Sequence, residues 1–388
     1  MSAIDLLDLA PFEATREHEV FAQLRRMPGL WFNPEPGGAG FWCVARHAEV
    51  VAAARNHAVF LSGHGTQIKN RRAEGHGAPS VHNADPPLHG RLRAIVMPGL
   101  SRQQVTARRP AFRAIVERLV ADTPRDEAFD FVERIAVRMP MLVIADMLGV
   151  PAEEAPGLVD WANLMSDMRA SDAEQAEARA QLFAYFRALA DAKRRTPGDD
   201  LASRMVAARL EDAPLEQQLL DAYFMLITVA GNETTRFLVT GGLAQLVRQG
   251  GWQTLRANPA LVPSAIEEMC RFVSPVAHMR RTAACDTDFA GTRIAKGDKV
   301  VLWFASANRD EAVFDRPDEL VLDRSPNPHV GFGVGAHFCL GTHLARLETA
   351  LLFETMLREI GDIAVLEEPV RLPSNWFTGW TGMKVRWQ

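Results

Sequence analysis

A single cysteine lies in a stretch whose composition could support chemistry. The stretch Gly331–Arg346 reads GFGVGAHFCLGTHLAR, with three glycines before Cys339 and another soon after it. Glycine permits backbone bends that other residues avoid, and it lets a flat ligand approach the backbone closely. A helix is expected to begin just after Cys339, and its free N–H groups and dipole favour a thiolate there. His337 could donate a hydrogen bond to an anion.

Taken from the residues alone, Cys339 has three interpretations. A buried free cysteine is the ordinary state of this residue type. A zinc site is the second, because His337, Cys339 and His343 form H-x-C-x3-H, although a structural zinc requires a fourth ligand and none is evident nearby. A catalytic nucleophile is the third, and it requires a positioned base together with a group that orients that base.

The same stretch resembles a known signature. FGVGAHFCLG (332–341) matches the haem-binding motif of cytochromes P450, F-G-x-G-x-H/R-x-C-x-G, at each fixed position: Phe332, Gly333, Gly335, His337, Cys339 and Gly341. The resemblance implies that Cys339 is the axial thiolate ligand of the iron of haem b, and that Phe332 and Gly333 contact this cofactor. A thiolate ligand pushes electron density onto the iron and favours O–O cleavage.

A second motif lies within a long apolar segment. AGNETT (230–235) places Gly231 inside an expected helix, which costs about 1 kcal/mol relative to alanine, and sets Glu233 beside Thr234. A helix kink from a threonine bonded to a carbonyl, with a surface glutamate, explains this segment in isolation. The segment also resembles the P450 oxygen-activation motif. That resemblance implies that Thr234 hydrogen-bonds dioxygen, that Glu233 relays protons, and that Ala230 and Gly231 leave room over the iron.

One charged pair lies at a position where the family has a structural motif. Glu268 and Arg271 have helical spacing about 70 residues before Cys339, and a pair of this kind is usually solvated and worth little. The position resembles the E-x-x-R motif of P450s, an ion-pair network that supports the haem loop. Arg324 would be its third partner, although the family often has an aromatic residue where Leu320 stands.

Haem propionates require cationic or hydrogen-bonding partners. HGRLR (89–93) resembles the H-x-x-x-R of a helix over the haem, and RRTA (280–283) resembles a family strand. Each of these cations, taken singly, could be an ordinary surface residue. The resemblance assigns the propionate partners as His89, Arg93, Arg281 and His337.

Composition excludes several classes of protein. The chain has 388 residues, 47% hydrophobic and 23% charged, as expected of a globular protein with a large core. A net charge of −5 argues against general nucleic-acid binding. Four cysteines without C-x-x-C spacing argue against a zinc ribbon or a disulfide scaffold. Neither a signal peptide nor a membrane-length apolar run is evident, so a cytoplasmic protein without a membrane partner is expected.

The elements predicted around these motifs are mainly helical with a minor β part. Residues 30–46 predict two short strands, and 61–88 an irregular loop. Pro214 suits the first turn of a long helix that runs to about Gly250, and 290–304 predict a hairpin that turns at Lys296–Gly297. Length alone suggests two or three domains. The resemblance instead implies the cytochrome P450 fold over residues 1–388, a single triangular-prism domain with haem between a long central helix and the loop and helix of the cysteine ligand.

The resemblance also implies monooxygenation with O2. The chain contains no dinucleotide-binding fingerprint, flavin domain or cysteine cluster, so electrons are expected from a separate ferredoxin and ferredoxin reductase. Two other functions stay open: a peroxygenase driven by hydrogen peroxide, and a non-catalytic haem protein that binds a ligand.

Family position places the substrate over an apolar lining. A hydrophobic small molecule is therefore expected, such as a terpenoid, steroid, fatty chain or small aromatic. His278 and the basic residues 69–72 could contact a polar or carboxylate end of it, with a solvated loop as the alternative for the latter. The residues expected to line this pocket are Leu226, Val229, Ala230, Val276, Ala277, Trp376 and Phe377.

Overall fold

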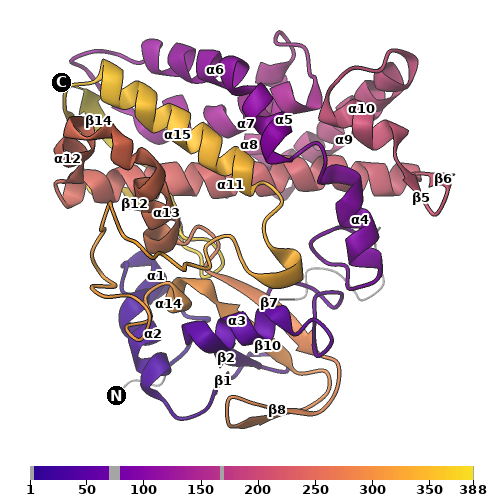
Figure 1. Cartoon of the computed structure of the whole chain (residues 1–388), viewed down its shortest axis with the longest axis vertical. Helices are drawn as coiled ribbons and strands as arrows, with labels where there is room; N and C mark the ends of the chain where they lie inside the picture. Colours follow the sequence, from indigo (N-terminus) through magenta and orange to yellow (C-terminus); the bar gives the residue numbers. More distant parts are fainter. Residues whose placement is uncertain (1–3, 70–78, 167–169, 388) are drawn as a thin grey trace.

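One long helix crosses the middle of the molecule and organises the elements around it (Figure 1). The computed structural model describes residues 4–69, 79–166 and 170–387. Its central helix, α11, spans 32 residues, Gln217–Arg248. The helix begins later than the sequence predicted, because Ala213–Pro214 forms strand β6 and pairs with β5 (Arg209–Leu210). The hairpin places Pro214 where its missing N–H is not required.

The other helices of the larger part pack around α11. Above it in Figure 1 lie α6, α7 and α15, while α8, α9 and α10 gather toward its N-terminal end. Their bounds are α4 Leu88–Val96, α5 Arg102–Ala107, α6 Arg109–Ala121, the π-helical η1 Val132–Ala136, α7 Arg138–Leu148, α8 Ala155–Ser166, α9 Asp172–Arg195, α10 Leu201–Ala207, α12 Gly251–Ala257, the 3-10 helix η2 Pro259–Leu261, α13 Val262–Val273 and α15 Thr342–Glu359.

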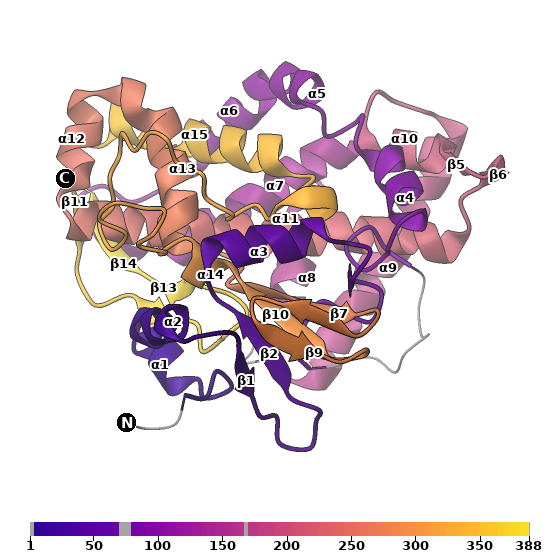
Figure 2. The same cartoon turned by 60° about the horizontal axis from the view of Figure 1, so that its bottom comes forward.

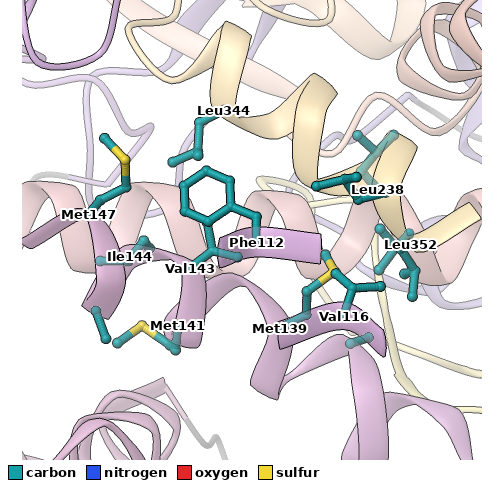
Figure 3. Packing of buried hydrophobic residues seen from close by; sticks show 14 of the residues in the cluster. Phe112, Val116, Met139, Met141, Val143, Ile144, Met147, Leu238, Leu344 and Leu352 are labelled. Carbon is teal, nitrogen blue, oxygen red and sulfur yellow. The ribbon is translucent and has the colours of Figure 1, made fainter. Parts of the chain in front are cut away.

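Apolar side chains from four helices interlock at the centre of this part (Figure 3). Phe112 of α6 is fully buried, Leu238 of α11 is 2% exposed, and Leu344 of α15 is 8% exposed. Each such side chain contributes about 1.5–3 kcal/mol when it is taken out of water. The packing fixes α11 relative to α15, the helix that follows Cys339.

A smaller part lies on the opposite side of α11 from α6 (Figure 2). Its five-stranded sheet has the order β1-β2-β10-β7-β3, parallel between β2 and β10 and antiparallel elsewhere. The elements here are α1 Ala10–Glu13, α2 Glu17–Arg26, β1 Trp31–Asn33, β2 Phe41–Val44, α3 His47–Arg55, β3 Phe60–Leu61, β7 His278–Ala283, β10 Lys299–Trp303 and α14 Phe304–Ala307. Two further small sheets join β4 Ala128–Asp130 to β11 Ile363–Val365 and β14 Lys384–Trp387, and β12 Val370–Arg371 to β13 Trp380–Gly382.

The predicted hairpin forms at a different turn. Strands β8 (Thr287–Phe289) and β9 (Thr292–Ile294) pair around Ala290–Gly291. Gly297 has a φ of 91° and belongs to the connection into β10, which pairs with β2 and β7. Both candidate turns offer a glycine with positive φ, so long-range pairing of β10 decided between them.

The mainly helical class with a minor β part is confirmed by these elements. Within the described ranges, no helix combines the length and the apolar character needed to span a bilayer.

Candidate functional site

A cavity of about 2100 Å³ lies between α11 and the segment that carries Cys339. Sites for drug-sized ligands usually measure about 300–1,000 Å³, so this cavity can hold a large flat cofactor together with a substrate. Phe332, Cys339 and Thr234 all lie in its wall.

The loop before Cys339 needs its glycines for two reasons. Gly333 and Gly335 have φ angles of 70° and 80°, in the left-handed region that favours glycine. A Cβ on Gly335 would also lie 2.8 Å from the carbonyl oxygen of Ala54 in α3. The Cys339 N–H donates to the Phe332 carbonyl at 2.9 Å, which closes the loop and fixes the backbone of Cys339 at the cavity wall.

The surroundings of Cys339 favour the thiolate form less than the sequence predicted. Burial raises the pKa of Cys339, while the Gly341 N–H and the charges of Arg93 and Arg346 act in the opposite direction. The start of the helix therefore does not secure a thiolate by itself. A metal cation in the cavity would do so, since metal binding displaces the thiol proton.

The zinc interpretation finds no support in the geometry. Among the described residues, no three His, Cys, Asp or Glu side chains converge as a metal site requires. His343 is exposed and lies on the first turn of α15.

Two arginines, Arg281 buried and Arg93 half-buried, lie at one wall of the cavity beside two histidines that are neutral at pH 7. Arg93, Arg281 and His337 line it, and the ring of His89 packs on that of His337 with centroids 4.2 Å apart. Burial lowers the pKa of Arg281 to about 10, and burial with the Arg281 charge lowers the pKa of His337 to about 3. Nε2 of His89 is buried without a hydrogen-bond partner.

The acid nearest this wall is already engaged. Asp85 raises the pKa of Arg281, but its carboxylate accepts the N–H groups of Ser62 and Gly63 at 2.7 and 2.8 Å. Burying cations without matched anions is costly. A bound group with two carboxylates would supply that match, so cavity size, sulfur and cationic wall together fit haem b.

Over the cavity, α11 carries the predicted acid and hydroxyl. Thr234 lines the cavity, and its Oγ1 donates to the Ala230 carbonyl at 2.8 Å, which leaves the oxygen lone pairs as acceptors. Glu233 also lines the cavity, with Oε1 3.9 Å from Nη2 of Arg236. Ala230 and Gly231 line it too, but a Cβ on Gly231 would meet Ile144 Cδ1 at 2.8 Å. The missing side chain of Gly231 thus serves the contact with α7.

Most of the predicted substrate pocket lies in the wall, and one residue does not. Ala277 is 2% exposed and packs in the core beneath the five-stranded sheet, because successive residues of an extended segment point to opposite sides. The residues that do line the cavity are Leu226, Val229, Ala230, Val276, Trp376 and Phe377.

His278 lies away from the cavity. Its Nδ1 bonds the Asn375 carbonyl at 2.9 Å, its ring packs 4.6 Å from that of Trp303, and burial lowers its pKa to about 4. It is not among the residues that line the cavity, so the expected contact of His278 with a polar end of the substrate is wrong. Residues 70–72 of the basic stretch lie outside the described residues.

The structure brings Glu268, Arg271 and Arg324 together. Both side chains of the Glu268–Arg271 pair are fully buried, with bonds of 2.7 and 2.8 Å, and Nε of Arg324 lies 3.0 Å from Glu268 Oε2. The other N–H groups of Arg271 donate to the carbonyls of Asn308, Pro317 and Glu319. Leu320 in place of an aromatic residue does not disturb this arrangement.

Sequence reasoning missed Glu348. This residue is 2% exposed on α15, lines the cavity, and accepts the Thr235 hydroxyl at 2.9 Å. Burial raises its pKa to about 8, so it is protonated at neutral pH. The sequence did contain one indication that Glu348 is buried. It follows Leu344 by four residues, so it lies on the apolar face of the helix.

Comparisons with known proteins agree with this geometry. Residues 252–360 match the family described as Cytochrome P450. The chain is 34% identical over 385 residues to linalool 8-monooxygenase of Pseudomonas putida, covering 95% of each chain. It is 36% identical over 391 residues to methyl-branched lipid omega-hydroxylase of Mycobacterium tuberculosis, covering 95% of this chain and 90% of that one. A solved cytochrome P450 of Mycobacterium marinum in complex with pseudoionone superposes with a TM-score of 0.91 at 33% identity, covering 100% and 99% of the two chains.

Removal of the Glu268 carboxylate should be far more costly than removal of an exposed one. Glu268→Ala leaves two arginines buried without their anion, and we expect a loss of about 3–5 kcal/mol in the free energy of unfolding. Asp191→Ala breaks an exposed pair of the same helical spacing, with Arg194, and should cost less than about 1 kcal/mol. Urea unfolding measures both, with Glu268→Gln as the milder variant if the alanine form does not accumulate. Similar losses at the two sites would contradict the structural role of the network.

Glu348 should make stability fall with rising pH. Its pKa in the folded state, about 8, lies above the ordinary 4.5, so the folded chain holds a proton that the unfolded chain releases between these values. The free energy of unfolding should therefore decrease across this window, by up to about 1.4 kcal/mol per pH unit. Glu348→Gln should flatten the decrease, whereas Glu354→Gln, on the half-exposed face of the same helix, should not. Equal pH profiles for wild type and Glu348→Gln would refute the assignment.

Proposed function

Because the chain belongs to the cytochrome P450 family, it is a haem-thiolate monooxygenase, and we propose that it oxidises a terpenoid or lipid chain. The observation that carries this substrate class is the apolar wall over Cys339, where Leu226, Val229 and Phe377 meet the cavity. Apolar walls of this kind bind ligands mainly by excluding water from them. Two relatives, a linalool 8-monooxygenase and a methyl-branched lipid omega-hydroxylase, support the same class by the substrates in their names.

The chain's residues divide the work of the reaction. Haem b, when bound at Cys339, supplies activation of O2 and oxidation of the substrate. We assign the propionates to the wall formed by His89, Arg93, Arg281 and His337, where their charge would offset the two arginines and the neutral histidines would donate hydrogen bonds. As the residue that would hold the iron, Cys339 would supply a thiolate whose electron density favours O–O cleavage.

Proton delivery falls to α11. Glu233 takes up a proton on the side of the helix that carries Arg236. It then delivers this proton to the cavity. The Thr234 hydroxyl, whose proton is committed to the Ala230 carbonyl, accepts a hydrogen bond there and orients the proton donor. Leu226 and Val229 exclude water from the carbon to be oxidised.

Electrons must come from a separate protein, and a ferredoxin is our proposed donor in a cytoplasmic setting. The Cys339 side of the molecule presents exposed arginines: Arg55 ends α3 beside the Cys339 loop, and Arg102 begins α5, which packs against α15. Phe338, directly before the ligand, is 38% exposed. These exposed side chains, two positive and one apolar, are the contacts that we propose for an acidic ferredoxin.

Loss of the Thr234 hydroxyl should uncouple electron use from oxidation. With haem-loaded protein, NADH and a surrogate ferredoxin system, Thr234→Val should consume NADH while it forms several-fold less product and more hydrogen peroxide. Thr228→Val is the matched control, since Thr228 makes the same backbone bond within α11, to Phe224 at 2.9 Å, but does not line the cavity. Unchanged coupling in Thr234→Val would refute the role of the hydroxyl.

The same assay separates the alternatives. Product formed faster with hydrogen peroxide than with the ferredoxin system would favour a peroxygenase. Absence of product from terpenoids and lipid chains that nevertheless bind would favour a non-catalytic ligand-binding protein.

Docking through arginines should make reduction sensitive to salt. Raising the ionic strength from about 50 to about 500 mM shortens the screening length from above 10 Å to below 5 Å, so the rate of reduction by an acidic ferredoxin should fall several-fold. Stopped-flow absorbance of the haem measures this rate, and a small neutral reductant is the control. A salt-independent rate would rule out electrostatic docking at this face.

A further inference from the structure

One face of α9 forms part of the cavity wall. Side chains spaced four residues apart lie on one face of a helix, and the cavity is lined by Gln175, Arg179, Phe183 and Arg187. The adjacent face of α9 is buried, and there Phe186 stacks on Phe224 of α11 with centroids 4.8 Å apart and an interplanar angle of 8°. This contact holds the helix so that the polar residues face the cavity.

Six arginines line the cavity. Five of them either contact an acidic side chain or are assigned to the haem propionates. Arg187 bonds Asp221 of α11 through Nε and Nη2, at 3.1 and 2.6 Å. Arg371 bonds Glu17 at 2.6 Å, and Arg236 lies 3.9 Å from Glu233. Arg93 and Arg281 belong to the cationic wall assigned to the propionates.

Arg179 is the sixth. Among the described residues, no side chain or carbonyl bonds its guanidinium, and its side chain is exposed. It lies eight residues from Arg187, or roughly 12 Å along α9, so Asp221 remains with Arg187. Apart from Arg93 and Arg281, Arg179 is thus the one arginine in the described part of the lining without an anion, and it lies on an element other than those that carry the haem contacts.

A second polar group in the lining also lacks a partner. Asn163 of α8, the helix that packs against α9, lines the cavity, and its Oδ1 is buried without a hydrogen bond. A buried amide oxygen left unpaired costs free energy that a donor on a bound ligand can recover. Polar groups on α8 and α9 therefore contrast with the apolar wall over Cys339.

We propose that the substrate is an apolar chain with a carboxylate at one end, and that Arg179 binds this carboxylate while the apolar part lies over Cys339. The inference rests on the proposed oxidation of a terpenoid or lipid chain and names its polar end. A guanidinium pairs with a carboxylate through two parallel hydrogen bonds, and a hydroxyl group elsewhere on the ligand would donate to Asn163 Oδ1.

The test compares an acid with its uncharged ester. Dodecanoic acid and methyl dodecanoate, and geranic acid and methyl geranate, are titrated into the haem-loaded protein, with binding followed by the ferric spin-state spectrum and by calorimetry. We expect the wild type to bind each acid about threefold more tightly than its ester, which corresponds to about 0.7 kcal/mol and lies in the range of an exposed ion pair. Arg179→Gln should abolish this preference and leave ester binding unchanged.

Arg195→Gln is the matched control, because it removes the same charge from the exposed end of the same helix, away from the cavity. Equal affinities for acid and ester in the wild type, or a preference that survives Arg179→Gln, would overturn the inference and leave the proposed function standing. If neither acids nor esters nor the parent hydrocarbons bind, the apolar pocket itself is wrong and the inference falls with it.

Discussion

The site depends on one buried ion pair, which fixes the backbone that leads into the Cys339 loop. Glu268 and Arg271 are sealed from solvent on α13, and they are stable only because every N–H of the guanidinium finds an oxygen and the carboxylate gains Arg324. Arg271 donates to the carbonyl of Asn308, whose side-chain oxygen accepts the N–H of Val330 at 2.7 Å. One chain of hydrogen bonds thus runs from the pair to the backbone that leads into the Cys339 loop. The position of the ligand is therefore set by an interaction far from the ligand itself.

The charged residues in the cavity wall differ in how the chain compensates their charge. Arg93 and Arg281 meet at one wall with no free carboxylate, since the nearby Asp85 is taken by backbone N–H groups. Glu348, in contrast, is buried with a hydroxyl as its partner and no cation, and it meets this by keeping its proton. The two arginines are left to an anion from outside the chain, whereas Glu348 removes its own charge by keeping its proton, although its Oε2 stays buried without a hydrogen-bond partner. That difference separates residues that await a charge partner from a residue that does not.

The sequence predicted the site better than it predicted the elements around it. The positions of the cavity residues near Cys339 follow from motifs in which glycine, threonine and cysteine are required at fixed spacing, and local chemistry suffices for them. The turn between β8 and β9 was missed because two glycines were equally suitable and the register of β10 decided. Ala277 was misplaced because the face of an extended segment depends on register. The spacing from Leu344 indicated that Glu348 is buried, but not that its partner is Thr235, which lies 113 residues away in the chain. The place of Arg179 in the cavity lining depends on how α9 packs against other helices, which no local pattern shows.

The hydroxyls of α11 suggest why proton transfer at Thr234 has a direction. Thr228, Thr234 and Thr240 each donate to a carbonyl one turn earlier in the helix, an arrangement that satisfies a buried hydroxyl without another side chain. At Thr228 and Thr240, both fully buried, nothing more is possible. At Thr234 the same bond leaves an oxygen that only accepts, facing a cavity and next to a carboxylic acid. A group that accepts but does not give up its proton aligns a donor without competing with it. In the reaction that we propose, protons would then pass along the Glu233 side, and the hydroxyl would determine where they arrive.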